Sequence, residues 1–392
     1  MKITLKRTEE QVELVKAMAS KNRDVAYQAQ VALAEFIGPV LAEVIAQAPT
    51  LSNLFTKFSF NEDDNASIPL DLYYDITDED YLTVWSQNVA GGLPSNAATP
   101  VQSEMKFTTY RLDSAIDFDK RYAARSRLDV VSKTFTRLAQ EILLKQDRNS
   151  AALVFGALAG NGKTDNVAST RGNGHVIGAN SAGRLILDDF NRLMTRAKRI
   201  NQSWAGGTPV GEGNRGVTDL IVSPEVVQSL REMAYNPIGT RNPDGSAISN
   251  TSASPIAATD SMRNDVYAGA GIPEFYGVSI MEIQEMGKGQ RYNKIFAGFS
   301  PDVEGPGTSG GTAASANHVV DFSDSTHEIV LGLDRSRDVM LHAVATDSET
   351  GSEFSLAADD QYSVRQNKIG YYGSVEEGRM ILDNRVLMGI CL

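Results

Sequence analysis

The glycine-rich segment at residues 157–164, ALAGNGKT, is the clearest candidate for chemistry in this sequence. In a nucleotide-binding P-loop, the backbone amides of a Gly-rich turn hold phosphate and a lysine, here Lys163, reaches the terminal phosphates. Ala157 stands where that motif requires its first glycine. The motif must also follow a strand and open a helix, whereas this segment follows a predicted long helix and runs into a loop. We interpret it as a glycine helix stop with a solvated lysine, and a nucleotide-binding enzyme that uses Lys163 is a remote alternative.

The remaining reactive side chains are scattered along the sequence. The four histidines lie in dissimilar contexts, with no pair at the spacing of helical metal ligands. The single cysteine, Cys391, has no histidine near it in the sequence. We therefore predict no catalytic residue, no cofactor and no metal, and we expect the chain not to be an enzyme.

Length and composition are those of a globular chain. The 392 residues can form two or three lobes with a sizeable core. Hydrophobic residues make up 42% and charged residues 22%, which excludes disordered and fibrous classes. One cysteine permits no intrachain disulfide, which fits a reducing cytoplasm. No apolar stretch approaches the roughly 18 residues of a membrane span, and the first residues turn acidic and amphipathic, so we expect neither membrane insertion nor export by a signal peptide.

The net charge of −12 limits how tightly the chain can bind nucleic acid. Tight binding of phosphates needs a basic surplus on at least one face, whereas this chain has 49 acidic and 37 basic side chains. We therefore expect any contact with DNA to be weak or merely confining.

Near the amino terminus, apolar residues recur every three or four positions from Leu33 to Ala48, which predicts one face of a helix. Gly38 and Pro39 interrupt the pattern, so we expect a kink or two helices. This helix either packs on its own domain or lies as an arm on a neighbouring subunit.

An acidic segment follows. No lysine or arginine occurs between Phe58 and Met105, and such a one-signed stretch repels itself unless a partner supplies cations. Strand-like pieces at 67–76 and 81–89 predict an extended hairpin with a Gly- and Pro-rich tip. A calcium site is the competing hypothesis, but the central glycine and terminal glutamate of a calcium loop are absent.

The rest of the chain alternates helices and strands. A strand at 107–120 precedes the longest helical pattern, 126–159, which would be on the order of 50 Å long. An amphipathic helix is predicted at 188–201. Ser223 should cap a further helix whose first residue is Pro224. Strands are then expected at 278–283, 294–299, 327–334 and 339–347, followed by a β-rich carboxyl-terminal segment.

This order of elements resembles the major capsid proteins of tailed phages that share the Hong Kong 97 type fold. In that family a strand leads into a long spine helix that closes with an Asp, an apolar run and a Gly-containing turn. The matching residues here are Asp147, Leu153, Phe155, Gly156 and Gly160 to Gly162. The segments 219–230, 276–299 and 364–392 resemble later parts of the family pattern.

The resemblance implies an α+β fold with four parts. Residues 1–58 would be an N-terminal arm and residues 59–106 an extended loop formed by a β-hairpin. Residues 107–214 would be a peripheral domain with the spine helix at about 126–160. Residues 215–392 would be an axial domain that includes returning peripheral-domain strands and an insertion at about 300–326.

The resemblance also implies a function. The chain would self-assemble through hexamers and pentamers into the icosahedral head shell of a virion that encloses double-stranded DNA, with assembly in the host cytoplasm. Its partners would be itself, portal and scaffolding proteins, a decoration or cement protein, and packaged DNA that is confined without tight binding; no membrane is expected. An encapsulin-type nanocompartment shell, which has the same fold around a cargo enzyme, is the alternative.

The acidic hairpin predicts cationic patches on a neighbouring subunit, since it has no basic residue of its own. The expected assembly contacts on the acidic side are Asp63, Asp64, Asp78, Glu79 and Asp80. The expected basic contacts are Arg121, Arg125 and Arg127, or Arg192, Arg196 and Arg199.

Overall fold

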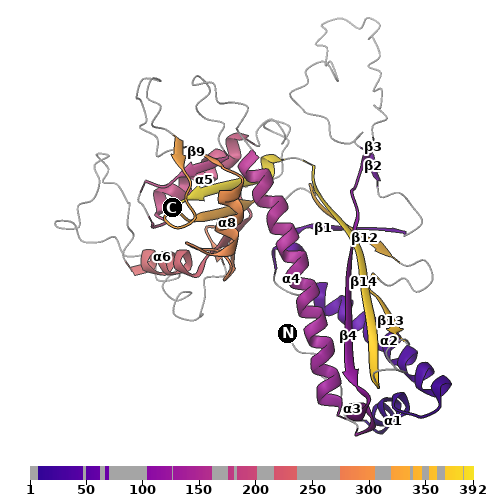
Figure 1. Cartoon of the computed structure of the whole chain (residues 1–392). Coiled ribbons are helices and arrows are strands. Elements are labelled where there is room, and N and C mark those ends of the chain that lie inside the picture. Colours follow the sequence, from indigo (N-terminus) through magenta and orange to yellow (C-terminus); the bar gives the residue numbers. More distant parts are fainter. Residues whose placement is uncertain are drawn as a thin grey trace, which may run out of the picture. The chain divides into compact units, whose positions relative to one another are not determined.

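The computed structural model describes residues 8–46, 50–61, 67–69, 104–125, 127–160, 175–180, 183–200, 216–235, 274–304, 319–335, 339–346, 353–359, 367–382 and 384–392 (Figure 1). The chain divides into two compact units. Unit 1 comprises residues 1–68, 106–151 and 340–380, and unit 2 comprises 69–105, 152–339 and 381–392. The fold is α+β, as predicted, because both units combine helices with a sheet.

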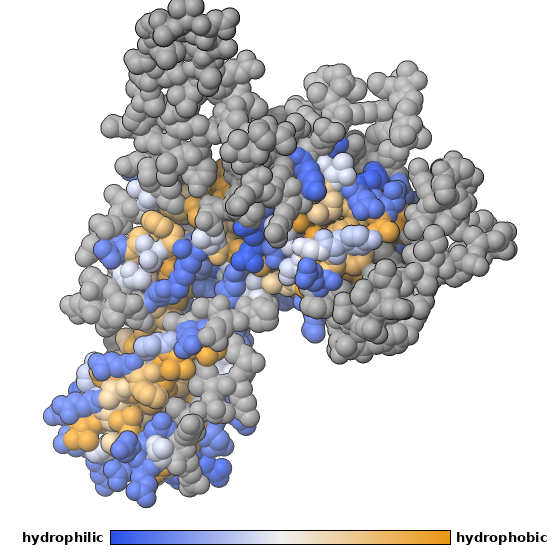
Figure 2. Space-filling view, turned by 180° about the vertical axis from the view of Figure 1, so that it is seen from behind, coloured by the Kyte–Doolittle hydropathy of each residue, from blue (hydrophilic) through white to orange (hydrophobic). Residues whose placement is uncertain are grey.

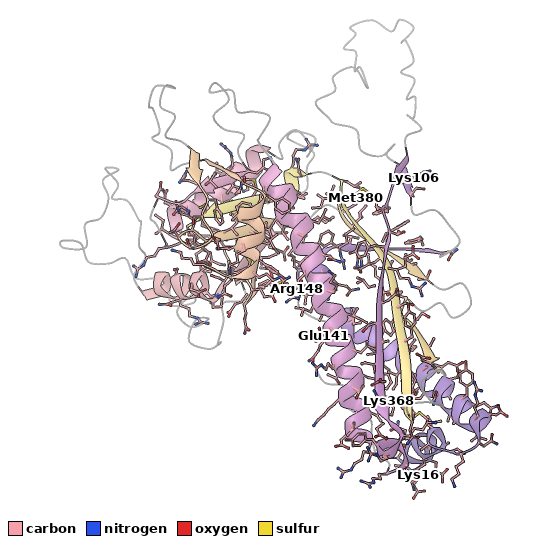
Figure 3. The ribbon with its side chains drawn as sticks, in the orientation of Figure 1. Lys16, Lys106, Glu141, Arg148, Lys368 and Met380 are labelled. Carbon is pink, nitrogen blue, oxygen red and sulfur yellow. The ribbon has the colours of Figure 1, made fainter. Side chains whose placement is uncertain are left out.

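A mixed five-stranded sheet forms the centre of unit 1. Its strands are β1 (Thr56–Asn61), β12 (Met340–Thr346), β14 (Lys368–Ile381), β13 (Ser355–Asp359) and β4 (Tyr110–Asp119). The order is β1-β12-β14-β13, and β4 also pairs with β14. Strands β4 and β14 are antiparallel over a register that runs from Lys368 opposite Asp119 to Glu377 opposite Tyr110. Figure 3 shows β14 running from Lys368 toward Met380.

Helices α1 (Glu9–Met18), α2 (Arg23–Ala46), α3 (Lys120–Ala124) and α4 (Leu128–Gly160) accompany this sheet, with the short 3-10 helix η1 at Leu51–Leu54. The predicted long helix is confirmed as α4, which has 33 residues. Its narrow apolar stripe is buried and shares one core with α1, α2 and β14. Residues at the centre of this core are Met18, Leu33, Ile37, Leu41, Phe135, Leu138, Ile369 and Tyr371.

Helix α2 differs from the sequence prediction. It begins ten residues earlier than the expected Leu33, at Arg23, and continues through Gly38 and Pro39 as one helix, so the two-helix alternative is wrong. Burial of Leu33, Ile37 and Leu41 on one face outweighs the hydrogen bond that Pro39 cannot donate. By length and composition the Arg23–Ile45 stretch could also cross a bilayer, contrary to our expectation, but a core helix passes the same test.

Unit 2 contains an eight-stranded sheet with the order β10-β9-β5-β15-β11-β6-β8-β7. Helices α5 (Leu187–Ile200), α6 (Pro224–Tyr235) and α8 (Arg291–Gly298) accompany it, with the 3-10 helix η3 at Asn384–Val386. The predicted helix cap is confirmed, because the Ser223 hydroxyl accepts a hydrogen bond of 3.2 Å from the Val226 amide. The strands are β5 (Val176–Gly178), β6 (Asp219–Val222), β7 (Glu274–Phe275), β8 (Val278–Glu282), β9 (Asp302–Glu304), β10 (Val319–Asp321), β11 (Ile329–Leu333) and β15 (Leu387–Cys391).

One strand prediction in unit 2 is wrong. Residues 294–299 were expected to be extended, but most of them belong to helix α8. Tyr292 and Phe296 are fully buried four residues apart, and both rings pack against Phe155. This spacing buries one face of a helix, whereas a strand would alternate.

The expected extended loop lies mostly outside the described residues. Its described ends, β2 (Ser67–Pro69) and β3 (Glu104–Lys106), pair with each other in a two-stranded sheet.

Candidate functional site

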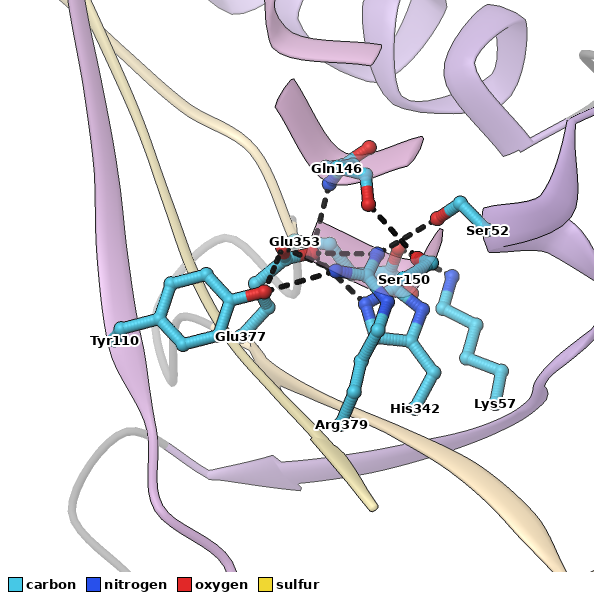
Figure 4. A network of polar contacts seen from close by, with 9 residues as sticks. All are labelled: Ser52, Lys57, Tyr110, Gln146, Ser150, His342, Glu353, Glu377 and Arg379. Carbon is cyan, nitrogen blue, oxygen red and sulfur yellow. Dashed lines mark hydrogen bonds and ion pairs between the residues drawn. The ribbon is translucent and has the colours of Figure 1, made fainter. Parts of the chain in front are cut away.

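The densest group of polar side chains in the described residues surrounds the carboxylate of Glu377 in unit 1 (Figure 4). Glu377 and its strand neighbour Arg379 are buried side by side, because residues two apart on β14 point to the same face of the sheet. The guanidinium of Arg379 donates to Oε1 at 2.6 Å and to Oε2 at 3.1 Å. This two-point contact is the strongest common geometry for an Arg–carboxylate pair.

Four further elements supply partners to this pair. The Tyr110 hydroxyl of β4 donates to Oε1 of Glu377 at 2.8 Å, and the Gln146 side chain of α4 donates to Oε2 at 2.9 Å. His342 Nε2 of β12 lies 2.9 Å from the same Oε2. Arg379 also donates to the Ser52 hydroxyl of η1 at 2.7 Å. We call these six residues the Glu377 cluster: Ser52, Tyr110, Gln146, His342, Glu377 and Arg379.

The electrostatics of the Glu377 cluster favour an ionised carboxylate. Burial by itself raises the pKa of Glu377, but the hydrogen bond from His342 and the charge of Arg379 more than offset it, and the pKa falls to about 2. Burial lowers the pKa of His342, and the positive Arg379 and Lys57 lower it further, against the pull of Glu377. Burial and the nearby Glu377 carboxylate raise the pKa of Tyr110. At neutral pH the cluster therefore holds one carboxylate, one guanidinium and a neutral imidazole.

A cavity of about 150 Å³ adjoins the cluster within unit 1. Lys57 of β1 forms an ion pair with Glu353 beside it, and both side chains line the cavity. The other lining residues are Ile45, Ser52, Asn53, Phe55, Gln146, His342, Val344, Phe354 and Val375. The lining contains no serine or cysteine hydrogen-bonded to a histidine, so the arrangement does not present an activated nucleophile.

Buried acids also occur in unit 2. The Glu328 side chain is nearly inaccessible, and burial raises its pKa although the Ser223 hydroxyl bonds to it. Asp189 on α5 is fully buried and accepts a hydrogen bond of 2.9 Å from the Asn180 amide. In the part of the chain that the structure describes, no group of three His, Cys, Asp or Glu side chains is placed to hold a metal ion.

The predicted assembly residues are only partly described. Asp63, Asp64, Asp78, Glu79 and Asp80 lie outside the described residues, as does the side chain of Arg199. Arg121, beside the exposed Arg125 and Arg127, forms an ion pair of 2.7 Å with Asp119 of its own chain. Arg192 on α5 lies 3.4 Å from Asp189, and Arg196 on the same helix is partly buried. The two arginine groups therefore belong to different units.

Helix α2 also exposes an apolar surface, whose residues the sequence pattern did not separate from the buried face. Val25, Phe36 and Val40 are 43%, 55% and 39% exposed, although each is apolar. Their positions around a helix of 3.6 residues per turn place them on one stripe beside the buried face. Figure 2 shows apolar residues gathered on the surface at the end of unit 1 that contains helices α1 and α2. We call these three residues the α2 stripe.

Comparison with known proteins gives structural matches alone. No family model matches the chain, and no curated protein matches it. The capsid of the cyanophage P-SCSP1u is 15% identical with a TM-score of 0.45 and covers 88% of each chain. The mature capsid of bacteriophage PhiM1 is 12% identical with a TM-score of 0.44, over 88% of this chain and 86% of that one. The holo-SrpI encapsulin complex from Synechococcus elongatus PCC 7942 is 11% identical with a TM-score of 0.42, over 87% and 85%.

Proposed function

We propose that this chain is a major capsid protein with the Hong Kong 97 type fold, which self-assembles into the icosahedral head of a tailed double-stranded DNA phage. One observation carries the proposal. The 33-residue helix α4 shares a core with the long antiparallel pair of β4 and β14, after an amino-terminal pair of helices and the paired strands β2 and β3. This is the order of elements that the sequence resemblance predicts.

The described polar groups suit a structural role. In the Glu377 cluster, the carboxylate receives hydrogen bonds from side chains of four strands and helices, which leaves it little capacity to bind a substrate. A buried network with this many hydrogen bonds stiffens a fold and favours one packing. The chain is accordingly proposed to be a shell subunit and not an enzyme.

The domain assignment is part of the proposal. Residues 1–58 are assigned to the arm and 59–106 to the extended loop. Strands β12, β13 and β14 belong to unit 1, which supports the idea of strands that return to the peripheral domain. Helix α5 packs in the core of the eight-stranded sheet, so we propose that the peripheral domain gives way to the axial domain within α4, near residue 151, instead of at the expected residue 214. The insertion at about 300–326 remains assigned to the axial domain, where β9 and β10 lie at its two ends.

Contacts between copies are proposed at the α2 stripe and at the acidic loop. An exposed Phe36 in a row with Val25 and Val40 costs hydration free energy that a neighbouring subunit would recover. Many weak copies of such a contact can hold a shell together without a dominant residue. Portal, scaffolding and decoration proteins are proposed as further partners, and the acidic balance would let confined DNA slide.

The test is negative-stain electron microscopy of the purified full-length chain, with mass measured by size-exclusion chromatography and light scattering. Uniform closed shells, or flat hexamer and pentamer rings, are the expected result. The chain is expressed alone and with the scaffolding protein from its own genome. A stable monomer or dimer under both conditions would contradict the proposal.

A second measurement separates a phage head from a nanocompartment. Particles recovered from infected or induced cells are treated with nuclease, and the protected contents are then extracted. Protected double-stranded DNA supports the phage head. A co-purifying enzyme without DNA would establish the encapsulin-type alternative.

A further inference from the structure

His342 occupies an unusual position for a histidine. Its side chain is only 13% exposed, and it lies between the buried Glu377 and the cavity lined by Lys57 and Glu353. Figure 4 shows the His342 ring among the side chains around Glu377. His342, Lys57 and Glu353 all line the cavity. One residue thus connects the buried carboxylate to a space that a proton can reach.

The hydrogen bonds of His342 determine its neutral tautomer. The ionised Glu377 carboxylate can only accept, so Nε2 of His342 must carry a proton to make the 2.9 Å contact. In the neutral ring Nδ1 is then the unprotonated nitrogen. Acid adds a proton at Nδ1 and creates a second positive charge next to Arg379.

The charges that face His342 come from every element packed around it. Glu377 attracts the protonated ring, whereas Arg379 on the same strand and Lys57 on β1 repel it. Glu353 pairs with Lys57, so it offsets part of that repulsion. The neutral Tyr110 hydroxyl donates a hydrogen bond to the same Glu377 carboxylate. Asp147 of α4, the residue after Gln146, accepts a hydrogen bond of 3.2 Å from the Ser52 amide.

The segment held by this cluster is short. Ser52 in η1 is bonded through its hydroxyl to Arg379 and through its amide to Asp147, and β1 follows immediately. Strand β1 pairs only with β12 among the described strands, and β12 carries His342. Residues 50–61 are thus attached through the hydrogen bonds of Ser52 and through the pairing of β1 with β12. A change at His342 therefore acts on both of these attachments.

We propose that His342 is an acid-sensitive switch: protonation of its ring loosens the attachment of residues 50–61 to β12, β14 and α4 while the rest of unit 1 stays folded. The inference concerns one chain and does not depend on the proposed shell. It stands on the contact with Glu377, the adjoining cavity and the positive groups on two sides of the ring.

The sign of the effect follows from the charges. The pKa of His342 in the folded chain is below that of a free histidine, so the folded state binds its proton less readily than the unfolded segment does. The stabilising contribution is present above the ordinary histidine pKa and is lost as the pH falls through the lowered one. Each unit of pKa difference corresponds to roughly a tenfold change in the population of the open segment.

The test is hydrogen–deuterium exchange of the full-length chain between pH 7.5 and pH 5.0, with rates corrected by those of the unfolded chain at each pH. In the wild type we expect the protection of peptides from residues 50–61 to fall on acidification, while peptides from 131–142 stay protected. In His342→Gln, which keeps a donor for Glu377 but cannot titrate, protection should no longer depend on pH. The matched control is His327→Gln in unit 2, which should behave like the wild type.

Two surface variants keep the proposal testable if His342→Gln does not fold. Lys57→Met removes a positive group that faces the ring, so the midpoint of the acid transition should move to higher pH. Glu353→Gln removes the opposing negative charge, so the midpoint should move to lower pH. An acid transition in residues 50–61 that is the same in all these variants, or no transition at all in the wild type, would overturn the proposal.

Discussion

Tyr110 and Glu377 face each other across β4 and β14 as register partners, and the tyrosine hydroxyl donates a hydrogen bond of 2.8 Å to the carboxylate. The sheet register therefore brings a polar pair into the interior of unit 1. Arg379 completes the arrangement, since it donates at 2.9 Å to the same tyrosine oxygen. The stability of unit 1 should depend on keeping this group complete.

Arg379→Met tests that dependence. The substitution leaves the buried Glu377 carboxylate without its guanidinium partner, which should lower the free energy of unfolding by about 3–5 kcal/mol. Urea denaturation measures the change. Arg111→Met is the control, because the Arg111–Asp113 pair is about half exposed and should change stability by roughly 0–1 kcal/mol. Equal effects of the two variants would refute the special role of the buried pair.

Acid should destabilise the chain in a second window, separate from the one proposed for His342. The pKa of Glu377 falls from 4.5 to about 2 in the folded chain, so its contribution is present above pH 4.5 and is lost as the pH falls toward 2. The expected loss is on the order of 3 kcal/mol. In Glu377→Gln this part of the pH profile of unfolding should be missing, and an unchanged profile would contradict the assignment.

Gly373 on β14 should not tolerate a side chain. A Cβ at this position would lie 2.7 Å from Cζ of Phe354, a buried ring, so Gly373→Ala is expected to cost about 1–3 kcal/mol. Gly298, the last residue of helix α8, has no atom within 4 Å of its added Cβ. Gly298→Ala should therefore be neutral or stabilising by about 0.5–1 kcal/mol. Thermal unfolding of the two variants, measured side by side, checks the difference in sign.

The sequence allowed good predictions where apolar residues recur along one face of a helix. Leu128, Val131, Phe135 and Leu138 in α4 repeat at helical spacing, and all four are buried. The helix cap at Ser223 could likewise be predicted, because it depends only on neighbouring residues in the sequence. By contrast, Tyr292 and Phe296 pack against Phe155, which is distant in the chain, and this contact, which favours a helix at residues 291–298, is not visible in the local sequence.

The Glu377 cluster was hidden for the same reason. Its members lie far apart in the sequence: Ser52 and Arg379, which are hydrogen-bonded, are 327 residues apart, and Tyr110 and Glu377 are 267 residues apart. A Glu and an Arg two residues apart in a β-rich segment indicate a shared face, but the sequence does not say whether that face is buried. The pairing of β4 with β14 decides whether the face that carries Glu377 and Arg379 is buried. The α2 stripe was missed because its apolar residues continue the pattern of the buried face.

Phe36 tests the proposed contact between copies. Phe36→Ser shortens an apolar side chain that is 55% exposed, so the folded subunit should lose less than about 0.5 kcal/mol of stability, while shell assembly should be reduced or lost. Tyr122→Ser on α3 is the matched control, because this ring is 46% exposed and lies outside the α2 stripe. Electron microscopy and light scattering measure assembly. Shells that form equally well from both variants would show that α2 does not bind a neighbour.

The last prediction concerns the basic partners of the acidic loop. Arg125 and Arg127 are exposed near the start of α4, whereas Arg192 on α5 already lies 3.4 Å from Asp189 of its own chain. The first pair therefore has more capacity for a neighbour's carboxylates. We expect Arg125→Glu with Arg127→Glu to block assembly and Arg192→Glu chiefly to destabilise unit 2. Reversing Asp78, Glu79 and Asp80 to lysine in the same chain should restore assembly of the first variant, because opposite charges then meet again. Sedimentation of assembled particles at low and high salt gives the result, and unimpaired assembly of the Arg125/Arg127 variant would rule out this pairing.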